Sequence, residues 1–233
     1  MNSKIEYKII KFDELPSTND YAKNRRADGE NLAVLAKRQT GGRGTKGRSF
    51  VSEEGGIYLS LLRFYEQFPA ENAFLIMAGA ATAVCETLTA FGLKPCIKWP
   101  NDIHVNGKKI CGILIENSFV GAFVRSSVVG IGLNVCNALP KELDGIAITM
   151  AKATGKAYAV EEVAARLLER LQYPADMQKY RAYLGYMGAQ VELLLGDERI
   201  PATLIRVEDN GNLTVQTVDG AHSFSAAEIS LRV

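Results

Sequence analysis

The sequence of 233 residues is poor in the residue types on which several enzyme classes depend. It contains only two histidines, His104 and His222, which lie far apart in the chain. A Ser-His-Asp hydrolase and a histidine-rich metal site are therefore not expected. The four cysteines are spread without a C-x-x-C pair, so their spacing indicates neither a disulfide framework nor a zinc site.

Strong net charge and long apolar runs are also missing. The formal net charge is +1, so no global field attracts nucleic acid or a membrane, and any basic site must be local. Residues 1–11 lack the apolar core of a secretory signal peptide. The longest apolar stretch, residues 73–84, is too short and too interrupted to span a bilayer. We therefore expect a cytoplasmic protein that binds neither DNA nor a membrane.

A glycine-rich basic segment, residues 40–48, has the sequence TGGRGTKGR. The N–H groups of glycines can approach a ligand closely, and successive N–H groups form a nest for anions. Arg43, Lys46 and Arg48 add positive charge. The segment predicts a loop that closes over a carboxylate or a phosphate. Taken alone, a flexible and solvated basic loop is the commoner explanation, so the rest of the chain has to decide.

The remaining pattern predicts an α+β fold, in which helices flank a mixed β-sheet. Strands are expected at residues 7–12, 31–37, 57–62, 103–105, 109–116 and 124–133, and helices at residues 20–27, 70–90, 160–172 and 175–187. Asn106 and Gly107 between two β-type runs are a strong hairpin signal.

The pattern changes near residue 189. Short strands at residues 191–195, 199–207, 213–218 and 223–233 are joined by turn residues. They predict a small C-terminal β-barrel of SH3 type. We therefore expect two domains, residues 1–186 and residues 187–233.

Four local features follow one another in the first domain. They are the glycine-rich loop, the segment KWPND at residues 98–102, Lys109 directly after the hairpin, and GIGLN at residues 130–134. Each has an ordinary structural explanation by itself, such as a turn or a solvated lysine. In combination and in this order, they resemble biotin protein ligase, also called biotin–[acetyl-CoA-carboxylase] ligase.

The resemblance covers essentially the whole chain. The further matching residues are Ser17-Thr18-Asn19, Gln39, KICGILIE at residues 109–116 and EISLR at residues 228–232. It implies a catalytic domain like that of class II aminoacyl-tRNA synthetases, followed by the SH3-like barrel. No helix-turn-helix precedes the first strand, so the DNA-binding domain of the bifunctional repressor-ligases is not expected.

The resemblance also implies a two-step reaction that uses biotin, ATP and Mg²⁺. The biotin carboxylate attacks the α-phosphate of ATP, which gives biotinoyl-5′-AMP and pyrophosphate. A lysine of a biotin carboxyl carrier domain, the implied partner, then attacks the acyl-adenylate and releases AMP. Because two anions must meet, cations have to offset their repulsion, and the mixed anhydride must be kept from water. The implied assembly is a monomer or a homodimer.

The resemblance assigns the site residues as follows. Biotin would be bound by Ser17, Thr18, Asn19, Gln39, Arg43, Gly44, Thr45, Lys109, Gly112, Leu114, Gly130 and Gly132. ATP would be bound by Arg43, Arg48, Lys98, Trp99, Asn101, Asp102, Lys109, Asn134 and Arg232. Lys109 and Arg43 would be the catalytic residues, and Asp102 would hold Mg²⁺.

The loop departs from the family pattern at two positions. Thr45 stands where the family commonly has arginine, which removes a cation that would retain the acyl-adenylate and that Lys46 replaces only in part. The aromatic residue that often follows the loop is represented only by Phe50, offset from its usual place.

The strand after the hairpin raises a geometric conflict. Strict alternation places Lys109 on the face opposite Gly112 and Leu114. All three can reach one ligand only if the strand bends or if Lys109 reaches in from the strand end. Gly112 is the expected position of a bulge.

Three alternative functions fit parts of the pattern. A lipoate or octanoate ligase or transferase shares the catalytic fold, but Ser17-Thr18-Asn19 and the WPND segment favour biotin. A non-catalytic biotin- or nucleotide-binding regulator would not need Lys109, Asp102 and Arg43 together. A nucleic-acid-binding protein is disfavoured by the near-neutral charge.

Overall fold

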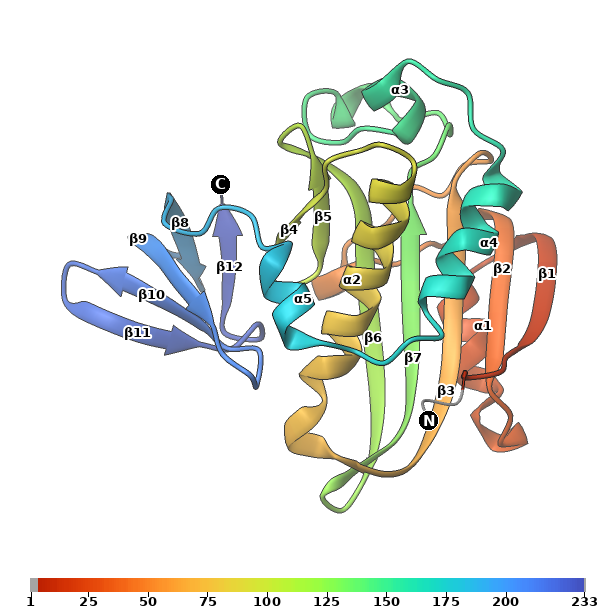
Figure 1. Ribbon diagram of the computed structural model, residues 1–233, viewed down its shortest axis with the longest axis horizontal. Helices are drawn as coiled ribbons and strands as arrows, with labels where there is room; N and C mark the ends of the chain where they lie inside the picture. Colours follow the sequence, from red (N-terminus) through yellow and green to blue (C-terminus); the bar gives the residue numbers. More distant parts are fainter. Residues whose placement is uncertain (1–3, 233) are drawn as a thin grey trace.

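The computed structural model describes residues 4–232, apart from the side chain of Lys46, and shows two β-sheets (Figure 1). The strands are β1 (Lys8–Leu15), β2 (Leu32–Gln39), β3 (Ile57–Pro69), β4 (Cys96–Lys98), β5 (Asp102–Val105), β6 (Lys108–Val120), β7 (Phe123–Leu133), β8 (Gln190–Leu195), β9 (Glu198–Val207), β10 (Leu213–Thr217), β11 (Gly220–Phe224) and β12 (Ile229–Arg232). The α-helices are α1 (Thr18–Asn24), α2 (Phe74–Ala90), α3 (Met150–Thr154), α4 (Val160–Arg170) and α5 (Met177–Ala182).

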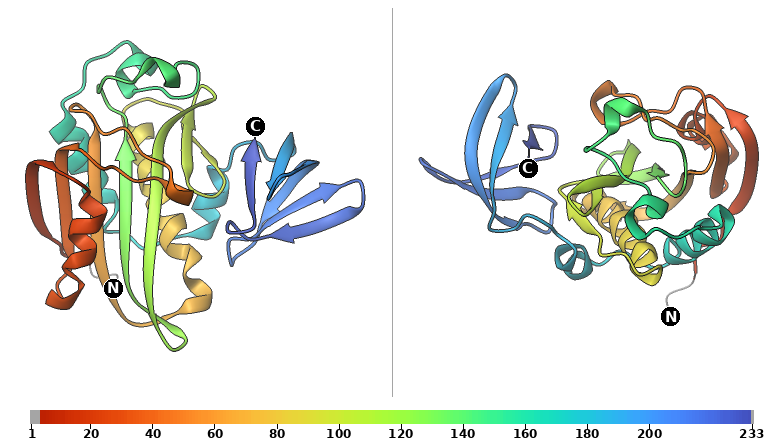
Figure 2. Two further views of the ribbon diagram at one scale, coloured as in Figure 1. Left: turned by 180° about the vertical axis from the view of Figure 1, so that it is seen from behind. Right: turned by 90° about the horizontal axis from the view of Figure 1, so that it is seen from above.

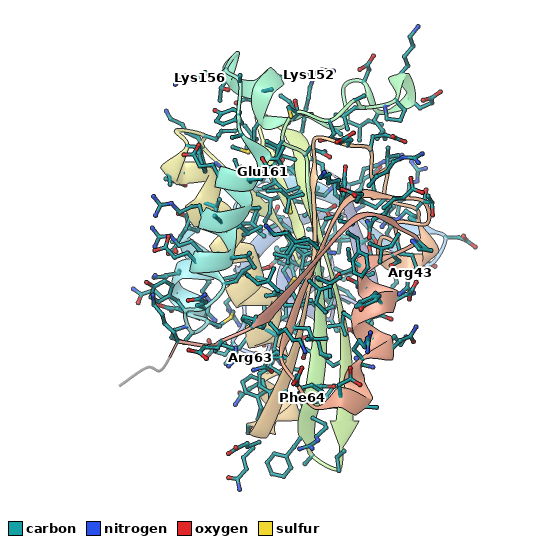
Figure 3. The ribbon with its side chains drawn as sticks, turned by 90° about the vertical axis from the view of Figure 1, so that its right-hand side faces the viewer. Arg43, Arg63, Phe64, Lys152, Lys156 and Glu161 are labelled. Atoms are coloured by element: carbon teal, nitrogen blue, oxygen red, sulfur yellow. The ribbon has the colours of Figure 1, made fainter. Side chains whose placement is uncertain are left out.

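The larger sheet has seven strands in the order β1-β2-β3-β7-β6-β5-β4. Strands β1 and β2 are parallel, and every other neighbouring pair is antiparallel. Helices α2 and α4 cover one face of this sheet, and α1 lies on the other (Figures 1 and 3). The predicted mixed sheet with flanking helices is therefore confirmed.

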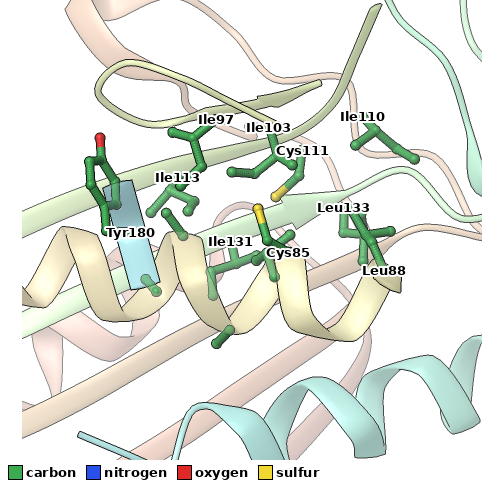
Figure 4. Close-up of a cluster of buried hydrophobic side chains, with 14 of the residues drawn as sticks. Cys85, Leu88, Ile97, Ile103, Ile110, Cys111, Ile113, Ile131, Leu133 and Tyr180 are labelled. Atoms are coloured by element: carbon green, nitrogen blue, oxygen red, sulfur yellow. The ribbon is translucent and has the colours of Figure 1, made fainter. Parts of the chain in front are cut away.

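Helix α2 forms the centre of the core. Its buried side chains include Cys85 and Leu88, which pack with Ile113 and Leu133 of the sheet (Figure 4). By length and composition alone, the helical stretch Ala70–Ala90 could cross a membrane, although the sequence had indicated a span too short for that. Half of its apolar window is buried inside the fold, as in the core helix of a globular domain.

The hairpin between β5 and β6 forms where the sequence predicts it. Asn106 and Gly107 both have positive φ, 52° and 74°, which a two-residue turn of type I′ requires. The turn leads directly to Lys109, so local turn chemistry fixes where the first residues of β6 begin.

Two predicted elements differ from the structure. The helix expected over residues 175–187 is only α5, whose start is capped by Asp176 and whose C-cap is Tyr183. Beyond it the chain turns towards the second sheet, with positive φ at Tyr186 and Gly188. The strand expected over residues 223–233 is wrong as a single element. It is the end of β11 and the separate strand β12, between which Glu228 accepts hydrogen bonds from the N–H and the hydroxyl of Ser225.

The C-terminal sheet is antiparallel, with five strands in the order β11-β10-β9-β8-β12. It stands beside the larger sheet, with α5 at the junction (Figures 1 and 2). The Trp99 indole N–H donates to the Gly211 carbonyl at 2.9 Å, and Arg181 donates to the Val207 carbonyl at 2.8 Å. These two bonds tie the WPND segment and α5 to the second sheet.

Candidate active site

A pocket lies on the face of the larger sheet opposite α2. Helix α1, the segment after β2 and the strands β6 and β7 surround it, and the segment after β2 crosses the face of these strands (Figure 2, left). It is lined by Ser17, Thr18, Asn19, Gln39, Arg43, Gly44, Thr45, Phe50, Asn101, Asp102, Lys109, Gly112, Ile113, Leu114, Gly130, Ile131 and Gly132. Every residue that the sequence assigns to biotin lines this pocket.

One end of the pocket is a buried polar network at the start of α1. Ser17 caps the helix by accepting a hydrogen bond from the N–H of Asp20. The Gln39 side-chain oxygen accepts from the N–H of Thr18 at 2.8 Å and from its hydroxyl at 3.0 Å. The Ser60 hydroxyl contacts both the Thr18 hydroxyl and the Asn19 side-chain oxygen, and its single proton is donated to one of them at a time. The network fixes uncharged donors and acceptors at one end of the pocket.

The floor of the pocket is bare backbone. Gly112 on β6 faces Gly132 on β7, and Leu114 faces Gly130. A Cβ at Gly130 would lie 2.1 Å from the side-chain oxygen of Asn19, closer than real Cβ contacts. Glycine is therefore required there by the close approach of α1 to the sheet.

Phe50 covers the other part of this floor. A Cβ at Gly132 would lie 2.5 Å from the Phe50 ring, and one at Gly112 would lie 3.3 Å from it. Phe50 is not among the site residues predicted from the sequence, because it is offset from the place where the family usually has an aromatic residue. The signal in the sequence is an aromatic residue two positions after the glycine-rich loop. In the structure, the Phe50 N–H donates to the carbonyl of Gly42 at 2.9 Å.

The geometric conflict on β6 is resolved by a bulge. Ile103 pairs with Cys111 and His104 pairs with Lys109, which leaves Ile110 as an extra residue in the strand. The bulge lies at Ile110 and not at Gly112, so that detail of the sequence prediction is wrong. The bulge shifts the alternation of side chains by one residue, so Lys109 and Gly112 lie on the same face of the strand. The Lys109 amine is accordingly 3.1 Å from where a Cβ of Gly112 would be.

The opposite end of the pocket is charged. The Lys109 amine lies 2.6 Å from the Asp102 carboxylate. Burial lowers the pKa of the Lys98 amine; Asp102 opposes this, and the positive charges of Lys109, Arg48 and Arg232 lower the pKa further. Four cations therefore lie near a single carboxylate, an excess of positive charge that suits an anionic ligand.

Arg43 is held at the rim by carboxylates. Its guanidinium donates to Asp20 and to Glu116, the latter at 3.2 Å. Burial opposes ionisation of Glu116, but the hydrogen bond from Lys23 and the charge of Arg43 outweigh it and lower the pKa of Glu116. Sequence reasoning missed Glu116 as a site residue, although it is the last residue of the KICGILIE motif.

Several residues that the sequence assigns to ATP do not line the pocket: Arg48, Lys98, Trp99, Asn134 and Arg232. Trp99 is buried and bonded to Gly211, and the buried Asn134 accepts from Asn137 at 3.2 Å. Asn101 does line the pocket, where its amide donates to the Ile113 carbonyl at 2.8 Å. The predicted compensation for Thr45 by the Lys46 side chain lies outside the described residues.

The charged end has few possible metal ligands. Across residues 4–232, no three His, Cys, Asp or Glu side chains gather as a metal site. Asp102 is the carboxylate at this end, and Mg²⁺ in nucleotide sites is usually held by one or two carboxylates together with phosphate oxygens. Asp102 therefore fits an ion that arrives with a nucleotide, and not one that the protein holds by itself.

Neutral polar groups at one end, glycine backbone along the floor and cations at or near the other end suit an enzyme that joins a small acid to an anionic co-substrate. Residues 11–134 match the Biotin/lipoate A/B protein ligase family. The chain belongs to this family, as the resemblance seen in the sequence predicts.

Within the family, the chain is similar to several proteins with known names. The bifunctional ligase/repressor BirA of Bacillus subtilis is 32% identical over 247 residues, which covers 96% of this chain and 74% of the relative. The biotin–[acetyl-CoA-carboxylase] ligase of Mycobacterium tuberculosis is 28% identical, covering 87% of this chain and 80% of the relative. A solved biotin protein ligase from Aquifex aeolicus, in complex with biotin and ATP, superposes with a TM-score of 0.75 at 28% identity, covering 97% of this chain and 98% of that one.

Proposed function

We propose that the chain is an ATP-dependent ligase that activates biotin as biotinoyl-5′-AMP. It then transfers the biotinoyl group to a specific lysine of the biotin carboxyl carrier protein of acetyl-CoA carboxylase or a related biotin-dependent carboxylase. One observation carries this proposal: the residues assigned to biotin line one pocket, and Lys109 and Asp102 stand at its charged end.

The neutral end of the pocket suits the ureido ring of biotin. A cyclic urea offers two N–H donors and one carbonyl acceptor, and it carries no charge. Ser17, Thr18, Asn19 and Gln39 provide hydroxyl and amide groups that can complement all three. The Phe50 ring covers Gly112 and Gly132 in this structure, so it would have to move aside for the fused rings to lie flat on the bare backbone, and it would then stack against their outer face.

The charged end suits the activation step. A carboxylate oxygen of biotin attacks the α-phosphorus, the bond from that phosphorus to the bridging oxygen breaks, and pyrophosphate leaves with the bonding electrons. Negative charge builds on the α-phosphoryl oxygens as the two anions meet. Lys109, between the two anions, would offset that charge. Arg43 would contribute to this effect once it leaves Asp20 and Glu116.

The nucleotide would extend from Lys109 towards the C-terminal sheet. Arg48, Lys98 and Arg232 would neutralise the phosphates, because all three act electrostatically on the same cluster. Asn101 and Asn134 would lie on the adenine or ribose side, with Trp99 packed behind them. Asp102 would hold Mg²⁺, and that ion would supply charge neutralisation on the phosphate oxygens.

Transfer of biotin needs an intermediate that is protected from water. The amine of the carrier lysine attacks the acyl carbon, the acyl–phosphate bond breaks, AMP leaves and the amine loses a proton. Residues 41–50 cover the pocket, with the Gly44 N–H bonded to the Arg48 carbonyl at 2.6 Å and Phe50 over the floor. Gly44 and Thr45 would lie over the biotinoyl carboxyl group until the carrier displaces this segment.

The same proposal covers the organisation of the chain. Residues 1–186 would form the catalytic domain, related in fold to class II aminoacyl-tRNA synthetases. Residues 187–233 would form an SH3-like barrel; the return of β12 to pair with β8 supports this, although β11 and β12 lie at opposite edges of the sheet. The protein would act in the cytoplasm without binding DNA, as a monomer or a homodimer.

Biotin-dependent ATP–pyrophosphate exchange tests the proposed function. Purified protein is incubated with Mg²⁺, ATP, labelled pyrophosphate and either biotin or lipoate. We expect label to enter ATP with biotin and not with lipoate. No exchange with biotin would reject the ligase proposal, and exchange with lipoate alone would assign the chain to the lipoate branch of its family.

A further inference from the structure

A second cavity, of about 250 Å³, lies on the other face of the larger sheet. It sits between β3, the first turns of α2 and the loop that joins α4 to α5. Figure 3 shows the sheet nearly edge-on, with Arg63 of this cavity on the side of α4 and Arg43 of the first pocket on the side of α1. Its lining residues are Tyr7, Leu61, Arg63, Tyr65, Phe68, Leu75, Ile76, Gly79, Ala80, Val129, Leu171, Tyr173, Pro174 and Ala175.

This cavity is separate from the site described above. Leu61 of β3 pairs with Val129 of β7, and their side chains form part of its floor. The adjacent pair, Ser60 and Gly130, points to the opposite face and belongs to the first pocket and its network. Alternation along the two strands thus places the cavities back to back, and no residue lines both.

The walls of the second cavity are mostly aliphatic or aromatic, and its charged side chain is Arg63. The guanidinium carbon of Arg63 lies 4.7 Å from the centroid of the Tyr65 ring. Among the ion pairs between described residues, none includes Arg63, whereas Arg38 and Arg43 each contact two carboxylates. A cation beside apolar walls without a counter-charge is a binding element for an anion.

Two tyrosines stand beside this cation. Burial raises the pKa of Tyr7 to about 12, and the charge of Arg63 acts in the opposite direction. Burial likewise raises the pKa of Tyr65, opposed by the charge of Arg63 and by a hydrogen bond with Ser127. Both hydroxyls therefore stay protonated at neutral pH. They leave the charge of Arg63 uncompensated, and the Tyr7 hydroxyl can donate to a ligand, whereas the Tyr65 hydroxyl already interacts with Ser127.

We propose that this cavity binds a small monocarboxylic acid with an apolar tail. The carboxylate pairs with the guanidinium of Arg63 and accepts from Tyr7, while the tail lies along Ile76 and Leu171. At ~30 Å³ for each water, the cavity has the volume of about eight water molecules, which suits a medium-chain acid. A neutral alcohol would leave Arg63 unpaired, and an amine would add a like charge.

Calorimetric titration with sodium octanoate tests the proposal. The protein is first saturated with biotin, so that octanoate cannot report on the carboxylate-binding end of the first pocket. We expect saturable binding of one octanoate, with octan-1-ol and octylamine binding at least about tenfold more weakly, since a charge-assisted pair is lost. Arg63→Gln should weaken octanoate binding by a similar factor. Arg125→Gln removes an exposed arginine of β7 outside the cavity and should change nothing.

A second variant covers the case in which Arg63→Gln does not fold. Ile76→Trp places a larger side chain in the cavity and should abolish octanoate binding, while biotin-dependent pyrophosphate exchange continues. Three results would each overturn the proposal: no saturable binding to the biotin-saturated protein, equal binding of octan-1-ol, or octanoate binding that both variants retain. Octanoate binding that biotin abolishes and Arg63→Gln leaves unchanged would place the acid in the first pocket, which also rejects the proposal.

Discussion

The change Gly130→Ala tests whether the contact between α1 and the sheet is what shapes the biotin pocket. The added Cβ would lie 2.1 Å from the Asn19 side-chain oxygen and 2.7 Å from its Cγ. Asn19 cannot simply move aside, because it is only 5% exposed. Its amide also bonds to Ser60 and, at 3.4 Å, to Glu116. The substitution must therefore turn the amide away and break both bonds.

The structure sets the size of the expected effect. Loss of two hydrogen bonds at about 1 kcal/mol each, with a buried amide left poorly paired, gives about 2 to 3 kcal/mol. Those internal bonds do not need biotin, so their loss affects stability. Biotin binding should weaken because Asn19, once turned away, loses its proposed bonds to the ureido ring, and two such bonds at about 1 kcal/mol each, with a ureido group left unpaired, also give about 2 to 3 kcal/mol. That loss of binding free energy corresponds to a Kd for biotin that is higher by roughly 30- to 150-fold. The rate of pyrophosphate exchange at saturating biotin should change much less.

A double-mutant cycle with Asn19→Ala separates this cause from a general loss of structure. Biotin Kd is measured by calorimetry for the wild type, both single variants and the double variant. When Asn19 is already truncated, Gly130→Ala should cost less than about 0.5 kcal/mol more. Gly41→Ala serves as the control, because a Cβ there would meet only the Pro16 carbonyl, at 3.4 Å. Additive effects, or an unchanged Kd in Gly130→Ala, would refute the reasoning.

Three other perturbations have defined outcomes. Lys109→Ala should lower kcat of pyrophosphate exchange at least about 100-fold with little change in biotin Kd; an unchanged kcat would remove Lys109 from catalysis. Thr45→Arg should slow release of biotinoyl-5′-AMP severalfold in a stopped-flow assay, and an unchanged off-rate would contradict its proposed role. Burial lowers the pKa of His104 to about 4, so the unfolded chain binds a proton between pH 6.5 and 4 that the folded chain does not. The unfolding free energy should therefore fall by up to about 3 kcal/mol across that range; His104→Gln should reduce this fall, and the exposed His222→Gln should not.

The parts of the fold that could be predicted are those whose cause is local. Asn106 and Gly107 specify their own turn, and Ser17 caps α1 with its own side chain. The apolar periodicity of α2 likewise predicts a core helix from its own residues. Strand β4 was missed because Cys96–Lys98 is too short to show a period, and it exists only because β5 pairs with it.

The polar network of the site could be predicted only in part, because its members come from distant parts of the chain. The residues at the start of α1 form a recognisable run, so they were found. Glu116 is 97 residues from Asn19 and 73 from Arg43, and no sequence spacing shows that the three meet. Arg63 could not be predicted as a binding residue for the same reason. In the sequence it is an ordinary arginine of a strand, and only the fold brings β3, α2 and the α4–α5 loop together around it.

The bulge at Ile110 shows why the two faces of β6 have to be considered together. Ile110 and Cys111 are adjacent, apolar and fully buried, and both belong to the core cluster beneath α2 (Figure 4). Strict alternation would send one of them into the pocket, along with either Lys109 or Gly112. One extra residue in the strand lets both apolar side chains enter the core and leaves Lys109 and Gly112 on the ligand face. Two adjacent apolar residues after the hairpin therefore indicate the bulge. By burying both of them on the core face of the sheet, the bulge places the Lys109 amine, which the proposed chemistry needs, on the ligand face.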